Sequence, residues 1–475
     1  MGMTTRALPL GGMRPAPRLW LAVAAATGVA LGVASSWKPG IALALAVAFA
    51  LAIACAFRAS AILAAMVVSV FVEVVSLGGI PVSRLVAPVA LLVFLLALVR
   101  GTAAVRFAAP LGWALAYSLW ALASGLWTVS VGSTSVELSS LAIALVYMLA
   151  FAGLLSDRAE LERVLAVVAV AALAIGLFAI AAFIGGGSRD LQEGRSAGGA
   201  GDPNFFAAYQ VVAIPLVLVL AGEARRRWLR AFLYATALVL IASVLTTLSR
   251  GGLVALGAIT LLTVVLPART IFRSRLQKTV VVLAIVAAAG VGFNAVAGTF
   301  LPRLDSMLSG GGGSGRLILW RGALTGFEEH PLTGLGYGGY MPVSNDLVYR
   351  TPGVSLADYD LHPNGQPAHN AYLGTAAELG VPGLLLFLGL LVSTGRALRR
   401  AARRARAAEA WFVMRVANAL TISLAGWAIS SLFLSSETSR PLWIMVGIAL
   451  ALPRLLAGDE AGDAGGLDLD RRLAR

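Results

Sequence analysis

The sequence predicts an all-α protein that crosses a membrane many times. Its mean hydropathy is +0.86, and 59% of its 475 residues are hydrophobic. Only 13% are charged, about half the share that is usual in soluble domains. The apolar residues also gather in long runs, and a helix needs about 20 such residues to cross a bilayer.

The runs predict about 12 to 14 membrane-spanning helices and one large polar loop. They divide the chain into a first tail, eleven helices, the loop, three further helices and a second tail, at residues 1–18, 19–297, 298–370, 371–456 and 457–475.

The placement of charge predicts the orientation. Most of the 37 lysines and arginines fall in alternate connections, including Arg225 to Arg227 and the run from Arg396 to Arg406. Cytoplasmic loops carry such an excess. Both termini are then cytoplasmic and loop 298–370 faces outward. This rule accounts for the net charge of +14 without nucleic acid as a partner.

The first seven apolar runs carry few polar candidates. Glu73 lies inside the third run, where a carboxylate is costly and therefore a functional candidate; it could equally reach the interface or pair with Arg84. Trp113, Trp120 and Trp127 repeat every seven residues on one helix face, which favours packing or interface anchoring.

The outer loop 185–204 is rich in glycine and carries Arg189 and Arg195 on the side that the charge rule leaves poor in arginine. A flexible linker is the simpler interpretation. At its end, Asp202 followed by Pro203 predicts the N-cap and first residue of a helix.

Two further arginines stand at outer turns. Arg250, in S-R-G-G, lies between two apolar helices, and its glycine neighbours allow close backbone approach. An arginine there is costly unless it meets an anion, a carboxylate or the interface, and we favour an anion. Arg316 follows a glycine run at an expected helix start, with Arg321 five residues later. Exposed N–H groups and a guanidinium suit phosphate; a linker into an interfacial helix is the alternative.

His369 and Asn370 stand where the polar loop ends and an apolar helix begins, after Pro367. The positive end of a helix dipole favours a neutral imidazole, which a general base requires. On a straight helix, Gly380 and Gly383 would share the face of His369, leaving room for a close neighbour. Glu378 would face away, so we do not expect it to orient His369. A capped membrane helix with no catalytic role is the alternative.

Together these stretches resemble the O-antigen ligase and O-antigen polymerase family of bacterial membrane glycosyltransferases. The resemblance rests on S-R-G-G at 249–252, G-R-L-I-L-W at 315–320, H-P-L-T-G-L-G-Y-G at 330–338, and H-N, nine residues, then G-V-P-G at 369–383.

The resemblance implies a GT-C-like fold in the bacterial inner membrane and an undecaprenyl-diphosphate-linked glycan donor. The acceptor would be lipid A–core for a ligase or a growing glycan chain for a polymerase. It makes His369 the general base and places Arg250, Arg316 and, less securely, Arg195 on the diphosphate. Arg321 and Asn370 would support them, and Tyr337 and Tyr340 would be available to stack on sugar rings. No metal or other cofactor is expected.

Two other functional classes remain to be weighed. A transporter of lipid-linked glycan predicts ionisable residues at mid-membrane and an internal repeat; the sequence has few of the former and no visible repeat. A purely structural membrane subunit leaves the outer histidine and arginines unexplained.

Overall fold

The computed structural model describes most of the chain, namely residues 59–73, 76–77, 80–185, 191–192, 195–283, 286–287, 290, 315–352 and 362–473. The tail expected at 1–18 and the first two apolar runs lie outside these residues.

Helices make up most of the described chain. Their bounds are α3 Ala59–Phe71, α4 Val82–Val99, α5 Ala109–Ala123, α6 Val131–Leu154, α7 Arg158–Gly185, α8 Pro203–Glu223, α9 Arg227–Thr246, α10 Arg250–Val265, α12 Arg316–Glu329, α13 Tyr340–Arg350, α14 Ala371–Ala407, α15 Trp411–Ser430 and α16 Arg440–Leu473. Short 3-10 helices occur at Ser124–Leu126, Gly198–Ala200 and Ala268–Thr270, the last labelled η3. Two antiparallel strand pairs join β1 Ser76–Leu77 to β2 Ile80–Pro81 and β3 Leu191–Gln192 to β4 Arg195–Ser196.

The predicted fold class is confirmed. Within the described residues, eight helices are long and apolar enough to cross a membrane, and α3 and α10 are shorter apolar helices. The protein is therefore an all-α polytopic membrane protein. Residues expected as a C-terminal tail continue α16 to Leu473.

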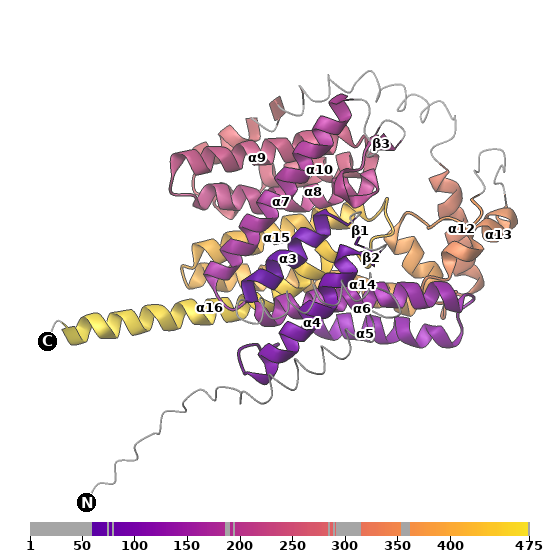
Figure 1. The fold of residues 1–475 in the computed structure, drawn as a ribbon, viewed down its shortest axis with the longest axis horizontal. Coiled ribbons are helices and arrows are strands. Elements are labelled where there is room, and N and C mark those ends of the chain that lie inside the picture. The colour runs from indigo at the N-terminus through magenta and orange to yellow at the C-terminus, as the bar shows by residue number, and fades with distance from the viewer. Residues whose placement is uncertain are drawn as a thin grey trace, which may run out of the picture.

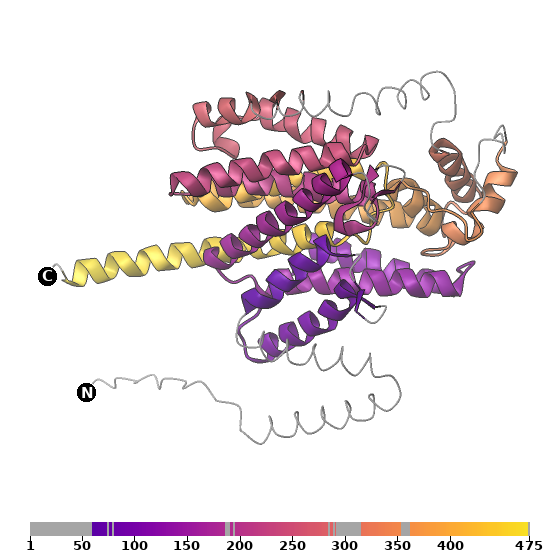
Figure 2. The same cartoon turned by 45° about the horizontal axis from the view of Figure 1, so that its top comes forward.

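The bundle is built around α8. This helix packs against α7, α9, α10 and α15, and 89% of its most apolar stretch is buried inside the protein. Helix α14 packs against α5 and α15, and α16 against α6. Helices α12 and α13 extend beyond one end of the bundle, away from the C-terminus (Figures 1 and 2).

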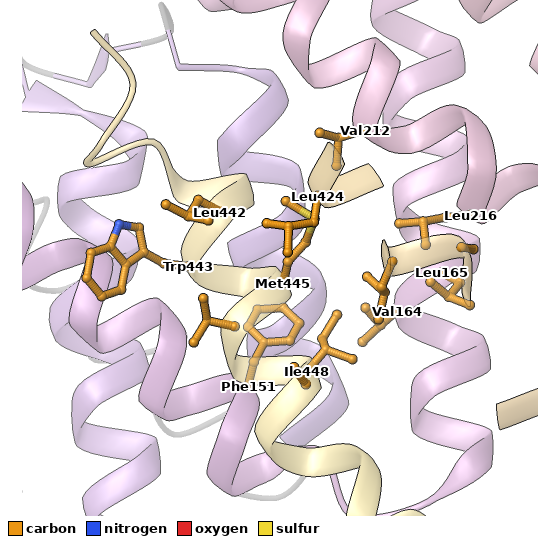
Figure 3. Packing of buried hydrophobic residues seen from close by; sticks show 14 of the residues in the cluster. Phe151, Val164, Leu165, Val212, Leu216, Leu424, Leu442, Trp443, Met445 and Ile448 are labelled. Carbon is orange, nitrogen blue, oxygen red and sulfur yellow. The ribbon is translucent and has the colours of Figure 1, made fainter. Parts of the chain in front are cut away.

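Helix α16 is held by close side-chain packing (Figure 3). Its Trp443, Met445 and Ile448 are buried in one cluster with Phe151 of α6 and Val164 of α7. Between membrane helices the hydrophobic effect contributes little, so the packing itself supplies the attraction.

Glu73 is part of an ion pair that ties the start of α16 to the rest of the bundle. Its carboxylate pairs with Arg440 and accepts a hydrogen bond from the Tyr209 hydroxyl at 3.1 Å. It therefore pairs with Arg440 and not with Arg84. A structural tie accounts for this costly carboxylate.

Helix α14 is not straight, and the face geometry expected from the sequence is wrong. Gly380 has φ 66° and ψ −166° inside the helix, two residues before Pro382, whose ring clashes with the preceding turn. His369 precedes the helix with a left-handed φ of 48°. The carbonyls of Ala377 and Leu379 accept hydrogen bonds from other segments, namely from the Leu335 N–H and from Trp120 Nε1. Gly380 and Gly383 do not continue the face of His369.

The kink receives the loop that follows α12. The Val381 N–H donates to the Pro331 carbonyl at 2.8 Å, and the Leu335 N–H donates to the Ala377 carbonyl at 2.9 Å. Glu378 accepts from the Gly338 N–H at 2.9 Å. Residues 330–339, which contain the H-P-L-T-G-L-G-Y-G motif, are thereby fixed against α14.

We predict that Gly380→Ala destabilises the protein by about 1–3 kcal/mol, because this backbone conformation strains any residue with a side chain. An added Cβ would also stand 2.6 Å from the Leu332 carbonyl group. Thermal unfolding of the purified protein in detergent measures the loss. Gly257→Ala is the matched control: nothing lies within 4 Å of its added Cβ, and alanine favours helix. Equal unfolding temperatures for both variants would contradict the prediction.

Candidate functional site

Four helices begin near one another at the end of the bundle that carries α12. Their N-caps are Asp202 for α8, Ser249 for α10, Gly315 for α12 and Asn370 for α14. The N-terminus of a helix carries a partial positive charge and free N–H groups. An anion is the complementary ligand for such an arrangement.

Asn204, in the first turn of α8, links two of these helix starts. Its Oδ1 accepts a hydrogen bond from Arg195 Nη2 at 3.0 Å and one from Ser249 Oγ at 2.8 Å. Arg195 Nε also donates to the Thr247 carbonyl at 3.0 Å. Arg195 is therefore fixed beside the turn that presents Arg250.

The glycines after Arg250 allow the close approach that the sequence predicts. A Cβ added at Gly252 would stand 2.5 Å from the Cβ of Ala207 on α8, and one at Gly251 would stand 2.8 Å from the Cβ of Phe433. The Phe433 ring in turn lies 6.3 Å from the Trp320 ring of α12, centre to centre. Phe433 thus connects the starts of α10 and α12.

Electrostatic coupling places the charged groups together. Burial lowers the pKa of Arg316, and the charges of Arg195 and Arg250 lower it further, while Asp202 raises it. Burial likewise lowers the pKa of His369, with Arg316 adding to the effect and Asp202 opposing it. The site combines three guanidinium groups, one carboxylate and an imidazole whose pKa is lowered from its usual value.

His369 and a neighbour of Arg250 have left-handed backbone conformations. His369 has φ 48°, and Leu248, two residues before Arg250, has φ 49°. Non-glycine residues rarely adopt this region, and such strain gathers at functional sites. The left-handed turn ends just before Asn370 begins the helix, so it fixes the direction from which His369 enters the site.

The two tyrosines expected to stack on sugar rings do not present a free face. Tyr337 and Tyr340 are each 1% exposed. The Tyr337 ring packs edge-on against Tyr117 at 6.2 Å, and the Tyr340 hydroxyl donates to the Leu319 carbonyl at 2.7 Å. That expectation is wrong, because both rings anchor the motif loop in the protein interior.

The other supporting residues divide between the helix cap and the surface. Asn370 is 5% exposed, and its Oδ1 accepts from the N–H groups of Tyr372 and Leu373, each at 3.0 Å. Its role here is to cap α14. Arg321 is exposed on α12, and Arg189 lies outside the described residues.

Sequence reasoning missed the residues that position the arginines. Asn204 and Ser249 lie in stretches that the sequence analysis describes, but it assigns them no role, although a polar residue at a helix start is the expected signal for a cap. Glu378 of α14, which we did not expect to orient His369, accepts hydrogen bonds from the N–H groups of Gly338 and Tyr340 and so holds the motif loop. Glu437, just before α16, is a buried carboxyl whose pKa burial raises to about 8.

The fold and this group of residues define a polytopic membrane protein in which three arginines and a histidine lie near the starts of neighbouring helices. Residues 235–388 match the family model described as O-Antigen ligase. This part of the chain is similar to that family, which supports the resemblance that its motifs predict. The matched range contains Arg250, Arg316 and His369 and excludes Arg195. A comparison with curated proteins finds no match.

We predict that His369 titrates below the usual histidine pKa of about 6.5, and that Arg316→Gln raises its pKa by removing a nearby positive charge. Histidine NMR of the purified His330→Gln/His362→Gln protein, in which His369 is the single histidine, measures this. Arg321→Gln on the same helix serves as control and should leave the pKa unchanged. An equal rise in both arginine variants would show a general surface effect instead.

Proposed function

We propose that the protein is a glycosyltransferase that moves a glycan from an undecaprenyl-diphosphate carrier to an acceptor hydroxyl at the outer face of the plasma membrane. The single observation that carries the proposal is the convergence of Arg195, Arg250 and Arg316 on a site that also contains His369. A diphosphate needs the cations, and an acceptor hydroxyl needs the neutral base.

The arginines suit the leaving group. A diphosphate gains negative charge as its bond to the sugar breaks, and fixed cations in a water-poor site stabilise that charge without rearranging. A guanidinium can contact phosphate through two parallel N–H donors. The starts of α10 and α12, at Arg250 and Arg316, also offer backbone N–H groups, which suit an anion.

His369 suits the acceptor. Its neutral imidazole takes the proton from the acceptor hydroxyl, and the oxygen forms a bond to the anomeric carbon of the donor. The bond from that carbon to the diphosphate oxygen breaks, and its electron pair leaves with undecaprenyl diphosphate. Attack from the side opposite the leaving group inverts the anomeric configuration. No step in this scheme requires a metal ion.

The acceptor we propose is the lipid A–core of a lipopolysaccharide, because the matching family model is described as a ligase. A polymerase that extends a glycan chain would use the same base and the same cations. Nothing in the described site favours the transporter alternative: Glu73, the carboxylate within an apolar run, is already paired with Arg440.

We predict that the histidine and the arginines affect different steps, namely glycan transfer and donor binding. His369→Ala should lower glycan transfer by about 10²–10⁴-fold while donor binding survives. Arg250→Lys and Arg316→Lys should weaken donor binding, because an ammonium is a point charge that cannot make the two-pronged contact. Purified protein with lipid-linked donor and acceptor allows transfer and binding to be measured separately.

Wild-type transfer should fall as the pH is lowered through the pKa of His369, since protonation removes the base.

The controls are His330→Ala and Arg321→Lys, two exposed residues on or beside α12. Both should retain transfer and donor binding. Near wild-type transfer by His369→Ala would make His369 a helix-end structural residue and refute the assignment.

We predict that the segment carrying α12 and α13 faces outward, because the connections on the other side hold the arginine clusters. A reporter enzyme that works only after export, inserted after Arg350, should be active, and the same reporter inserted between Arg225 and Arg226 should be inactive. The reverse pattern would overturn both the orientation and the proposed donor.

A further inference from the structure

A large cavity lies at the other end of the helices that form the candidate site. Its volume is about 1030 Å³, at the upper end of the roughly 300–1,000 Å³ of small-molecule sites. Six arginines line its wall: Arg269, Arg273, Arg275, Arg399, Arg403 and Arg406. All six are exposed.

The cavity is far from the anion site at the helix starts. Helix α14 begins one residue after Asn370 and brings Arg399, Arg403 and Arg406 to the cavity in its last turns. Helix α10 begins at Arg250 and ends beside Leu266, which lies on the cavity wall. The same helices therefore carry one cationic region at each end.

The wall is fixed by contacts within the protein. Asn418 of α15 donates from Nδ2 to the Thr270 carbonyl at 3.1 Å, which holds η3 against α15. Glu223, at the end of α8, is the carboxylate that neutralises part of this region. It pairs with Arg273 at 2.8 Å and with the buried Arg415.

The remaining arginines have no such partner. Within the described residues, no ion pair involves Arg269, Arg275, Arg399, Arg403 or Arg406. On α14, spacings of four and three residues place three of them on one helix face. The positive-inside rule explains why arginines lie on this side of the membrane, but it does not require them to converge on one cavity.

The other lining residues indicate what enters. Trp411 is 42% exposed and lines the cavity with Leu266 and Met414. Tryptophan at the end of a membrane helix typically lies at the level of the lipid headgroups. Headgroup phosphates lie at that level, with acyl chains beside apolar side chains. A free anion in solution would not use the apolar part of the wall.

We infer that this cavity binds the headgroup of an anionic phospholipid, with cardiolipin preferred because its two phosphates match a cluster of several unpaired arginines. The lipid would fasten α10, α14 and α15 to one another at the end opposite the candidate site. This inference does not depend on the proposed glycosyl transfer.

The experiment compares two pairs of arginines on one helix. The full chain is placed in nanodiscs of phosphatidylcholine that contain cardiolipin. Native mass spectrometry then counts the cardiolipin molecules that stay bound when the protein is released from the nanodisc. Arg399→Gln/Arg403→Gln removes two charges from the cavity. Arg400→Gln/Arg404→Gln removes two exposed charges from a neighbouring face of α14 that does not line it. Glutamine supports a helix about as well as arginine.

We expect the cavity pair to lower the affinity for cardiolipin by about tenfold or more, and the control pair to leave it unchanged. Arg269→Gln/Arg275→Gln, which changes lining residues outside α14, should show the same loss and guards against a folding defect in α14. Equal loss in cavity and control pairs would show general surface attraction and overturn the inference. Retention of cardiolipin in both cavity pairs would also overturn it. The inference would also be overturned if the detergent-solubilised wild type bound inorganic pyrophosphate but did not selectively retain cardiolipin.

Discussion

The end of the bundle that carries α12 brings several positive charges close to one another. Arg195, Arg250 and Arg316 lie close enough that the first two lower the pKa of the third. The positive ends of several helices add to the same potential. Like charges disfavour one another, so the surrounding protein has to hold them in place. Asp202 offsets part of this repulsion.

Neutral groups do much of this positioning. Asn204 Oδ1 accepts from both Arg195 and Ser249, so it connects the loop before α8 to the start of α10. A hydrogen bond between a charged donor and a neutral acceptor restrains the arginine without neutralising it. A carboxylate in place of Asn204 would pair with Arg195 and weaken the site.

The kink in α14 links the histidine to the arginines. Gly380 opens the helix so that residues 330–339 can dock against it, and the same segment follows α12, which begins at Arg316. The start of α14 is held separately, because the Ala371 N–H donates to the Ser431 carbonyl at 2.9 Å. The motif that looked like a sugar-binding turn is thus a structural connection between two parts of the site, and its two tyrosines are buried for that reason.

The sequence by itself determined the all-α membrane fold, the helix start at Pro203 and the place of Arg250 at the turn between two apolar helices. These features follow from local rules: apolar runs long enough to span a bilayer, capping residues, and glycine or proline at turns. Only the tertiary structure decided the path of α14, the burial of Tyr337 and the partner of Glu73. Each of these depends on contacts between residues distant in the sequence. A strained conformation such as that of Gly380 exists only because a separate segment supplies the hydrogen bonds that the broken helix lacks.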